Sequence, residues 1–318
     1  MMQRVVALSG GVGGAKLALG LYRVLPPGTL TVLVNTGDDF EHLGLRICPD
    51  LDTTLYTLAG LADPERGWGR KDETWNFMET LAVVGGDTWF RLGDRDLALH
   101  LERTCRLAEG ASLSAVIEEV SPRLGICATV VPVTDDPVRT EVETEDGVLP
   151  FQEYFVRRRC EPRVLKFHYA GAARARLSPG ARRALADGPD LIVICPSNPF
   201  LSIDPQLAIP ALRPALRASG APVIAVTPII GGEAVKGPTA KIMRELGLAL
   251  TPAVIARHYA DVINGFVADA RDEGGGVEFG CAVTFTNTLM RSLEDRECLA
   301  RAVLAFAAAA ALRRSARA

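Results

Sequence analysis

The sequence predicts an α/β fold built around a doubly wound, mainly parallel sheet. Residues 5–8 and Leu30–Val34 are short, almost wholly apolar runs, and a helical pattern over residues 15–24 separates them. Runs that are apolar on both faces are typical of parallel strands covered by helices on both sides. The pattern returns at Leu191–Ile194 and at 222–226, each time followed by a loop rich in Gly, Pro, Ser or Asn. Both ends of the chain are therefore expected to build one sheet.

The middle of the chain has a different pattern. Residues 132–155 alternate polar and apolar side chains around Glu145-Asp146-Gly147, which is typical of a β-hairpin. Residues of about 60–125 are expected to be mainly helical. We therefore expect a single Rossmann-like unit with an inserted helical and β-hairpin cap. The expected division of residues 1–318 is a core of about 1–60 plus 185–318 and a cap of about 61–184.

Composition narrows the class of protein. The net charge is −3, with 48% hydrophobic and 23% charged residues, so neither general disorder nor strong attraction to nucleic acid or acidic membranes is expected. The seven cysteines form no C-x-x-C pair, which fits reduced thiols in the cytoplasm better than a zinc ribbon or a disulfide framework. The apolar run at 5–8 is too short for a signal peptide. The stretch 302–312 is too short for a membrane span and is expected to be a packed C-terminal helix.

A glycine-rich segment, residues 9–16, joins the first strand to the first helix. Glycines at this position let backbone N–H groups approach an anion, and the helix dipole adds to the attraction. The segment matches neither the Walker A pattern nor G-x-G-x-x-G. The alternative to an anion-binding site is therefore a tight strand–helix turn that binds no ligand. We favour a phosphate or nucleotide site. Its glycines are Gly10, Gly11, Gly13 and Gly14.

An acidic group follows the second strand. Residues 38–41 and 49–53 carry carboxylates near the expected carboxyl edge of the sheet, where α/β proteins bind ligands. Asp50 or Asp52 could instead cap the helix that starts near Thr53, although one cap needs only one of them. Several carboxylates beside a diphosphate would repel it without a divalent cation, and hard oxygen ligands suit Mg²⁺. The sequence therefore predicts that at least one of these carboxylates binds a metal.

Three further segments could carry chemistry. Arg95, in the segment 92–96, could clamp a phosphate or an acceptor, or it could be part of a charged turn that opens a helix. The loops 196–199 and 228–239 could be connecting turns, but both should emerge at the same sheet edge as the glycine-rich segment. The four His are scattered without metal-ligand spacing, and nothing indicates a nucleophile–His triad.

Seven of these segments occur in a specific order, although each is weak alone. They are Ser9-Gly10-Gly11-x-Gly13, Asn35-Thr36-x-Asp38-Asp39, Pro49-Asp50-Leu51-Asp52-Thr53, Leu92-Gly93-Asp94-Arg95-Asp96, Asp135-Asp136-Pro137-Val138, Pro196-Ser197-Asn198-Pro199-x-x-Ser202-Ile203 and Pro228-Ile229-Ile230-Gly231. The ordered set resembles the 2-phospho-L-lactate transferase (CofD) family of coenzyme F-420 biosynthesis, over nearly the whole chain. The resemblance implies a Rossmann-like core, a homodimer and dependence on Mg²⁺.

The resemblance also implies a reaction. A phospholactyl-type group (phospholactate, phosphoenolpyruvate or phosphoglycerate) moves from a guanosine diphosphate-linked donor to the ribityl 5′-hydroxyl of Fo, 7,8-didemethyl-8-hydroxy-5-deazariboflavin, and GMP leaves. Asp50 and Asp52 would hold Mg²⁺ and orient the hydroxyl, with one of them as a possible proton acceptor, and Arg95 would contact Fo or the phosphate. The implied donor-binding residues are Gly10, Gly11, Gly13, Gly14, Lys16, Asn35, Asp39, Ser197, Asn198, Gly231 and Lys236.

Parts of the sequence also fit two other functions. A related family of nucleotide-sugar-binding regulators shares the glycine-rich start and the Asn-x-x-Asp-Asp segment, and its members bind UDP-sugars without turnover. The segments 92–96 and 135–138 favour the transferase. An NAD-dependent dehydrogenase, with Asp38 or Asp39 on the ribose, is disfavoured by the imperfect glycine fingerprint and the lack of a placed catalytic His.

Overall fold

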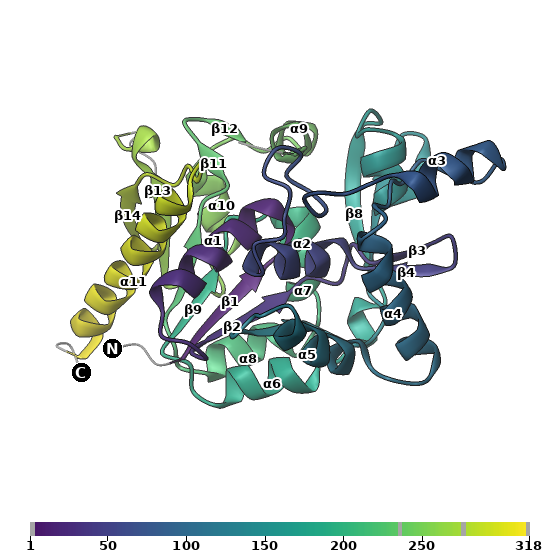
Figure 1. Ribbon diagram of the computed structural model, residues 1–318. Coiled ribbons are helices and arrows are strands. Elements are labelled where there is room, and N and C mark those ends of the chain that lie inside the picture. Colours follow the sequence, from purple (N-terminus) through teal and green to yellow (C-terminus); the bar gives the residue numbers. More distant parts are fainter. Residues whose placement is uncertain (1–3, 235–236, 275–277, 316–318) are drawn as a thin grey trace.

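The computed structural model describes residues 4–234, 237–274 and 278–315, and a parallel sheet forms its centre (Figure 1). Seven strands lie in the order β14-β13-β10-β9-β1-β2-β5, and every neighbouring pair is parallel. The predicted Rossmann-like α/β fold is therefore confirmed. The strands are β1 (Val5–Ser9), β2 (Leu30–Val34), β5 (Thr129–Pro132), β9 (Leu191–Ile194), β10 (Val223–Val226), β13 (Gly265–Asp269) and β14 (Ala282–Thr286).

Helices cover both faces of the sheet because its central strands are apolar on both sides. Val5 and Ala7 of β1 pack in one cluster, whereas Val6 and Leu8 pack in the cluster on the other face. The first cluster contains α1 (Gly11–Val24), α2 (Pro49–Leu58), α5 (Leu113–Arg123) and α11 (Leu293–Ser315). The second contains α6 (Pro179–Ala186), α7 (Asp204–Leu207), α8 (Leu212–Ala218), α9 (Thr239–Glu245) and α10 (Pro252–His258).

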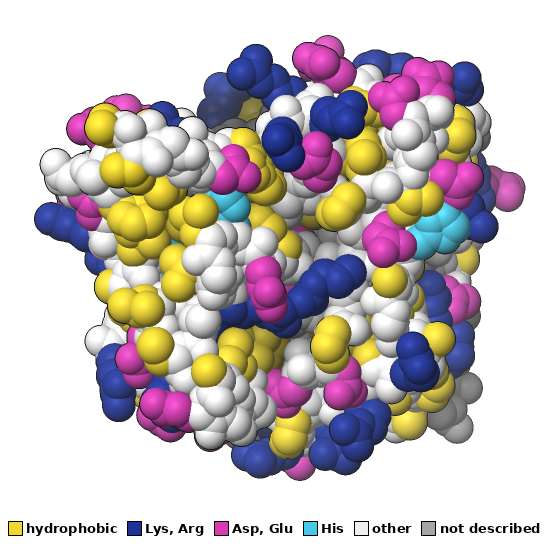
Figure 2. Space-filling model, turned by 90° about the vertical axis from the view of Figure 1, so that its right-hand side faces the viewer, with side chains coloured by type: hydrophobic (Ala, Val, Ile, Leu, Met, Phe, Trp, Pro, Cys, Tyr) yellow, Lys and Arg dark blue, Asp and Glu magenta, His cyan; other side chains and the backbone are white. Residues whose placement is uncertain are grey.

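A lateral lobe projects from the carboxyl-edge side of this core, on the right in Figure 1. It contains the antiparallel pair β3 (Phe40–His42) and β4 (Leu45–Ile47) with α3 (Asn76–Val83) and α4 (Asp96–Ala108). Ile47, Met78 and Leu92 form its small apolar core. Figure 2 views the molecule from this side and shows Lys and Arg side chains gathered across the middle of the face.

A separate antiparallel sheet, β7-β6-β8, lies beside the lobe. It consists of β6 (Arg139–Thr144), β7 (Gly147–Pro150) and β8 (Val164–Ala170). Thr144 pairs with Gly147 at the turn, which confirms the hairpin predicted around Glu145-Asp146-Gly147. The remaining short elements are β11 (Ile229–Ile230), β12 (Glu233–Ala234), η1 (Glu153–Arg157), η2 (Ala172–Arg174), η3 (Pro199–Ile203) and η4 (Ala270–Asp272).

The expected cap, residues of about 61–184, does not lie wholly outside the core. It includes β5, which pairs in parallel with β2, and α5 and α6, which pack on opposite faces of the main sheet. Within residues 61–184, the material outside the core is therefore in two pieces, one between α2 and α5 and the other between β5 and α6. A run as short as β5 has no periodicity that separates it from a neighbouring hairpin, so composition alone did not assign it to the core.

The helix predicted at the C-terminus is α11, and it begins earlier than the apolar stretch at 302–312. It packs so closely on α1 that a Cβ atom at Gly20 would overlap the carbonyl oxygen of Arg296. Within the described residues, no helix combines the length and the apolar character needed to span a bilayer.

Candidate active site

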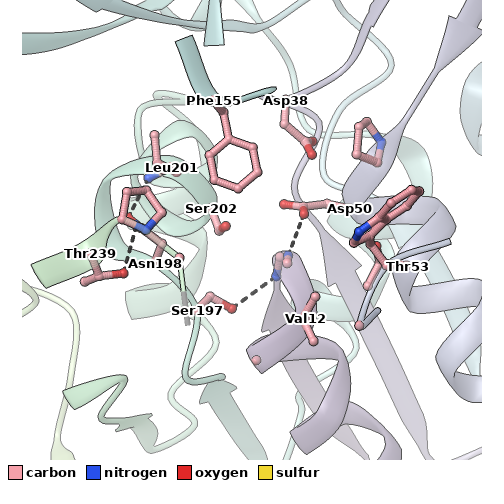
Figure 3. Close-up of a pocket in the computed structure, with 18 of the residues that line it drawn as sticks. Val12, Asp38, Asp50, Thr53, Phe155, Ser197, Asn198, Leu201, Ser202 and Thr239 are labelled. Carbon is pink, nitrogen blue, oxygen red and sulfur yellow. Dashed lines mark hydrogen bonds between the residues drawn. The ribbon is translucent and has the colours of Figure 1, made fainter. Parts of the chain in front are cut away.

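A cavity of about 680 Å³ lies at the carboxyl ends of the central strands. The loops after β1, β9 and β10 all line it, as the sequence predicted from their common sheet edge. They contribute residues 10–13, 196–198 and 227–228, and residues 237–239 close the same side. Figure 3 shows Ser197, Asn198 and Ser202 facing Asp38 and Asp50 across the cavity.

The glycine-rich turn is packed tightly against its neighbours. Gly11 has a φ of 63°, a left-handed conformation that favours glycine, and α1 begins there. A Cβ atom at Gly13 would overlap the carbonyl oxygen of Pro196, and one at Gly14 would overlap Ser197 Oγ. Gly10, Gly11 and Gly13 line the cavity, whereas Gly14 faces Ser9 and Ser197. The glycines therefore bring the N-terminus of α1 to the cavity wall by permitting close packing, and this end of a helix attracts anions.

Asp50 is held in a fixed orientation in the first turn of α2. The Gly11 N–H donates to Asp50 Oδ1 at 2.5 Å, and Asn35 Nδ2 donates to Asp50 Oδ2 at 2.9 Å. Asn35 also donates to the carbonyl oxygen of Leu201 at 3.2 Å. Asn35 is wholly buried and does not line the cavity, so it orients Asp50 and lies outside the predicted donor-binding surface.

Asp38 lies beside Asp50 in the cavity wall. Burial raises the pKa of the Asp38 carboxyl well above its usual range, and the neighbouring Asp50 charge adds to this shift. Burial also raises the pKa of Asp50, although the hydrogen bonds from Asn35 and Gly11 act in the opposite direction. Asp38 Oδ1 is buried and has no hydrogen-bond partner within the described part of the chain. Two desolvated carboxyls of this kind need a shared proton or a cation between them.

Asp52 does not join this pair, and the prediction that Asp50 and Asp52 act together is corrected here. Residues two positions apart on a helix point to different sides. Both oxygens of Asp52 bind Arg103, with Nη1 at 3.1 Å from Oδ2, and His100 Nδ1 lies 3.6 Å from Oδ2. Asp52 does not line the cavity. Its carboxylate is therefore committed to the interface between α2 and α4.

Asp39, predicted to bind the donor, also lies outside the cavity lining. Cys48 Sγ donates to Asp39 Oδ2 at 3.2 Å, and the Arg46 guanidinium lies 3.8 Å from the same oxygen. Burial raises the pKa of Asp39 to about 6, although Arg46 and Arg139 favour its charged form. The carboxylate that reaches the cavity from this loop is that of its neighbour, Asp38.

The segment 92–96 serves mainly to build the lobe. Asp94 accepts hydrogen bonds from the Thr74 hydroxyl and from the backbone N–H groups of Asn76 and Phe77 at the start of α3. These bonds, that from Thr74 first, lower the pKa of Asp94 to about 2. The Tyr56 hydroxyl donates to Asp96. Arg95, predicted to be catalytic, has an exposed side chain and does not line the cavity. The helix that begins beside Arg95 turns that side chain to the outer surface, which corrects the expected contact.

Ser197 and Asn198 line the cavity as predicted. Asn198 accepts hydrogen bonds from two N–H groups at the start of η3 and donates to Thr239 Oγ1 at 2.9 Å. Lys16 also lines the cavity and donates to the carbonyl oxygen of Met290 at 3.1 Å. These contacts join η3 to the start of α9, and α1 to the segment after β14, around one space.

Gly231 is not part of the cavity lining. The N–H groups of Gly231 and Gly232 both donate to the Asp272 carboxylate, at 2.9 and 3.1 Å. The turn thus already holds an anion from its own chain, which corrects the expected contact between Gly231 and the donor. Lys236 lies outside the described residues.

One wall of the cavity was not predicted from the sequence. Aromatic and cationic side chains from two loops of the lobe and from the region of η1 form this wall. The clustering of all three Trp of the chain at residues 68 to 89 could have indicated an aromatic wall. The side chains are Arg66, Trp68, Trp89, Phe90, Arg91, Phe151 and Phe155.

Comparisons with known proteins place the chain in a family. The family described as 2-phospho-L-lactate transferase CofD matches residues 5–274. A phosphoenolpyruvate transferase of Streptomyces griseus is 40% identical over 313 residues, covering 96% of this chain and 98% of that protein. A phosphoenolpyruvate transferase of Mycobacterium bovis is 41% identical over 276 residues, covering 80% of this chain and 83% of that protein.

The fold is shared with a solved structure. A UPF0052 family protein from Bacillus halodurans superposes with a TM-score of 0.62 at 15% identity, over 96% of this chain and 99% of that chain. At this identity the likeness concerns the fold. Together with the match over residues 5–274, the ordered loops at the carboxyl edge of the sheet lead to one conclusion: the chain belongs to the 2-phospho-L-lactate transferase CofD family.

Proposed function

We propose that the protein transfers a phosphate-linked three-carbon acid from a guanosine diphosphate-linked donor to the ribityl 5′-hydroxyl of Fo, in coenzyme F-420 biosynthesis. Membership of the CofD family supports the reaction class. The names of the relatives favour phosphoenolpyruvate among the three acids, with phospholactate and phosphoglycerate as the other candidates. The observation that carries the proposal is the buried Asp38–Asp50 pair beside the N-terminus of α1 in one cavity.

The reaction needs little covalent chemistry from the protein. The Fo hydroxyl oxygen attacks the phosphorus that carries the acid, a new O–P bond forms, and the bond to the bridging diphosphate oxygen breaks. The electron pair of that bond leaves with GMP, and the hydroxyl proton passes to Asp38 or Asp50. Phosphoryl transfer of this kind depends on positioning and charge neutralisation. Asp50 is suited to position the hydroxyl and accept its proton, because Gly11 and Asn35 fix the Asp50 carboxylate.

We propose that Asp38 and Asp50 hold Mg²⁺. The fit rests on two neighbouring buried carboxyls, one of which, Asp38, has an oxygen without a hydrogen-bond partner in the described residues. No group of three or more His, Cys, Asp or Glu suited to a metal occurs in the part of the chain described. Mg²⁺ is commonly held by one or two carboxylates together with substrate phosphates, so a two-carboxylate site is sufficient. When bound, the ion would neutralise charge on the diphosphate.

The two substrates would occupy different parts of the cavity. The donor diphosphate suits the end formed by the N-terminus of α1, Lys16 and Ser197, where positive charge and helix dipole are available. The planar ring of Fo suits the aromatic side, where Trp89 and Phe155 line the same space. Asp38 and Asp50 would lie where the two substrates meet.

Product analysis tests this function. Purified protein is incubated with Mg²⁺, Fo and the guanylylated form of each three-carbon acid, and the products are weighed by mass spectrometry. We expect GMP and Fo joined through phosphate to one of the acids. In parallel, thermal stabilisation by GDP is compared with that by UDP-N-acetylglucosamine. Stronger stabilisation by the UDP-sugar, with no product from Fo, would favour the regulator function and overturn the proposal.

The homodimer implied by the resemblance and the cytoplasmic location expected from the cysteines stay predictions. Light scattering after size-exclusion chromatography tests the first, and fractionation of cells tests the second.

A further inference from the structure

Arg91 is a cation held at the cavity wall. Its side chain lines the cavity, and its guanidinium carbon lies 4.1 Å from the centre of the Trp75 ring. This distance is typical of a cation–π contact, which uses the face of the guanidinium group and leaves the N–H groups at its edge available. Among the described residues, Arg91 forms no ion pair with a carboxylate.

Arg66 provides a contrast on the same wall. Its guanidinium carbon also lies near Trp75, at 5.1 Å from the ring centre. Arg66, however, is paired with Asp63 at 2.6 Å, and its Nε donates to the same carboxylate at 2.8 Å. Its charge is therefore already balanced within the chain. Of these two arginines of the cavity wall, Arg91 is the one whose charge a ligand would neutralise.

The backbone on both sides of Arg91 is anchored. The Phe90 ring meets the Phe40 ring edge-on, with ring centres 4.8 Å apart. Leu92 is fully buried against Ile47 and Met78 in the core of the lobe. With both neighbours packed and Trp75 beneath its guanidinium, Arg91 is pre-organised, so little conformational entropy would be lost when it binds a ligand.

We propose that Arg91 is a specificity-determining residue that binds the carboxylate of the transferred three-carbon acid. The inference rests on the proposed function and extends it to the part of the donor that distinguishes it from GDP. The diphosphate has the N-terminus of α1 and Lys16 at the core side of the cavity, whereas Arg91 lies on the lobe side. A planar guanidinium matches a carboxylate through two parallel hydrogen bonds, which a lysine does not reproduce.

The test compares Arg91→Gln and Arg91→Lys with Arg95→Gln. Arg95 is a matched control because it is four positions away, exposed and outside the cavity lining. We expect Arg91→Gln to raise the KM for the guanylylated acid roughly tenfold or more, as the loss of a charged hydrogen bond commonly does, while the dissociation constant for GDP stays unchanged. Arg91→Lys should recover part of the loss, and Arg95→Gln should behave as wild type.

A second substrate sharpens the test. The ethyl ester of GDP lacks the carboxylate but keeps the diphosphate, so wild type and Arg91→Gln should bind it equally well. An equal loss of affinity for GDP, its ester and the guanylylated acid would place Arg91 on a phosphate and overturn the carboxylate assignment. Wild-type kinetics in Arg91→Gln would remove Arg91 from the site. Calorimetric binding of the guanylylated acid gives the same comparison without turnover, so a failure of transfer to Fo would count against the proposed function alone.

Discussion

Asp52 on α2 and Arg103 on α4 form a buried ion pair that fastens the lateral lobe to the core. Arg103 is 0% exposed, and it also donates to the carbonyl oxygen of Arg46 at 3.2 Å. His100 lies between Asp52 and Asp96, at 3.6 and 3.3 Å. A charge buried as deeply as that of Arg103 is tolerated only with its partner in place. The pair therefore joins α2 of the core to α4 of the lobe.

Removal of one partner should destabilise the fold strongly. We expect Arg103→Met to lower the free energy of unfolding by about 3–5 kcal/mol, because the Asp52 charge would stay buried without a counter-ion. The double variant Asp52→Leu/Arg103→Met should recover much of this loss, since it removes both charges. Urea denaturation followed by circular dichroism measures all three proteins. As a control, Arg106→Met breaks a pair with Glu119 that is far more exposed, and a loss of similar size there would contradict the role given to burial.

The Asp38–Asp50 pair should be required for transfer. We expect Asp38→Asn and Asp50→Asn each to reduce kcat by roughly a hundredfold or more, as removal of groups that stabilise the transition-state charge commonly does. EDTA should abolish the activity of the wild type and Mg²⁺ should restore it. Glu41→Gln is the matched control, because Glu41 is an exposed carboxylate in β3, three positions after Asp38. Full activity in both asparagine variants would move the metal site away from this pair.

As the pH is lowered, magnesium binding should begin to weaken at a pH that is unusually high for carboxylate ligands. The pKa values of Asp38 and Asp50 are both raised, so their ionised forms, which the cation needs, are lost as the pH falls through values above the ordinary range of Asp. Without metal, a carboxyl with a raised folded-state pKa costs stability as the pH rises through its unfolded-state pKa. The increase in Tm on adding Mg²⁺ should thus be larger at about pH 8 than at about pH 6. The same increase at both pH values, or its persistence in Asp38→Asn, would disagree with this assignment.

Two glycines of α1 allow packing and ligand binding to be separated. A Cβ atom at Gly13 would overlap the carbonyl oxygen of Pro196 beside the cavity, and one at Gly20 would overlap that of Arg296 in α11. We expect both Gly13→Ala and Gly20→Ala to cost about 1–3 kcal/mol of stability through overpacking. Only Gly13→Ala should also weaken GDP binding, because Gly20 does not line the cavity. Calorimetry at a temperature where both variants are folded measures this, and intact GDP affinity in Gly13→Ala would show that the turn serves packing alone.

Much of the fold follows from local sequence. Strands β1, β2, β9 and β10 are apolar on both faces, and this pattern permits only a sheet covered on two sides. Parallel strands present their carboxyl ends at one edge, so the convergence of the loops after β1, β9 and β10 was predictable without coordinates. The location of the cavity was therefore determined by the sequence. The aromatic wall was foreseeable in part, from the clustering of the Trp residues.

Which side chain of each loop reaches the cavity was decided by the tertiary structure. Asp50 and Asp52 look equivalent in sequence, but the packing of α2 on α1 and α4 turns one towards Gly11 and the other towards Arg103. Likewise, the start of α4 turns Arg95 outwards, while Trp75 holds Arg91 at the cavity wall. The side to which a residue points changes by about 100° with each step along a helix. A sequence pattern therefore locates a site to within a few residues, whereas the choice among neighbouring residues depends on contacts with elements distant in the chain.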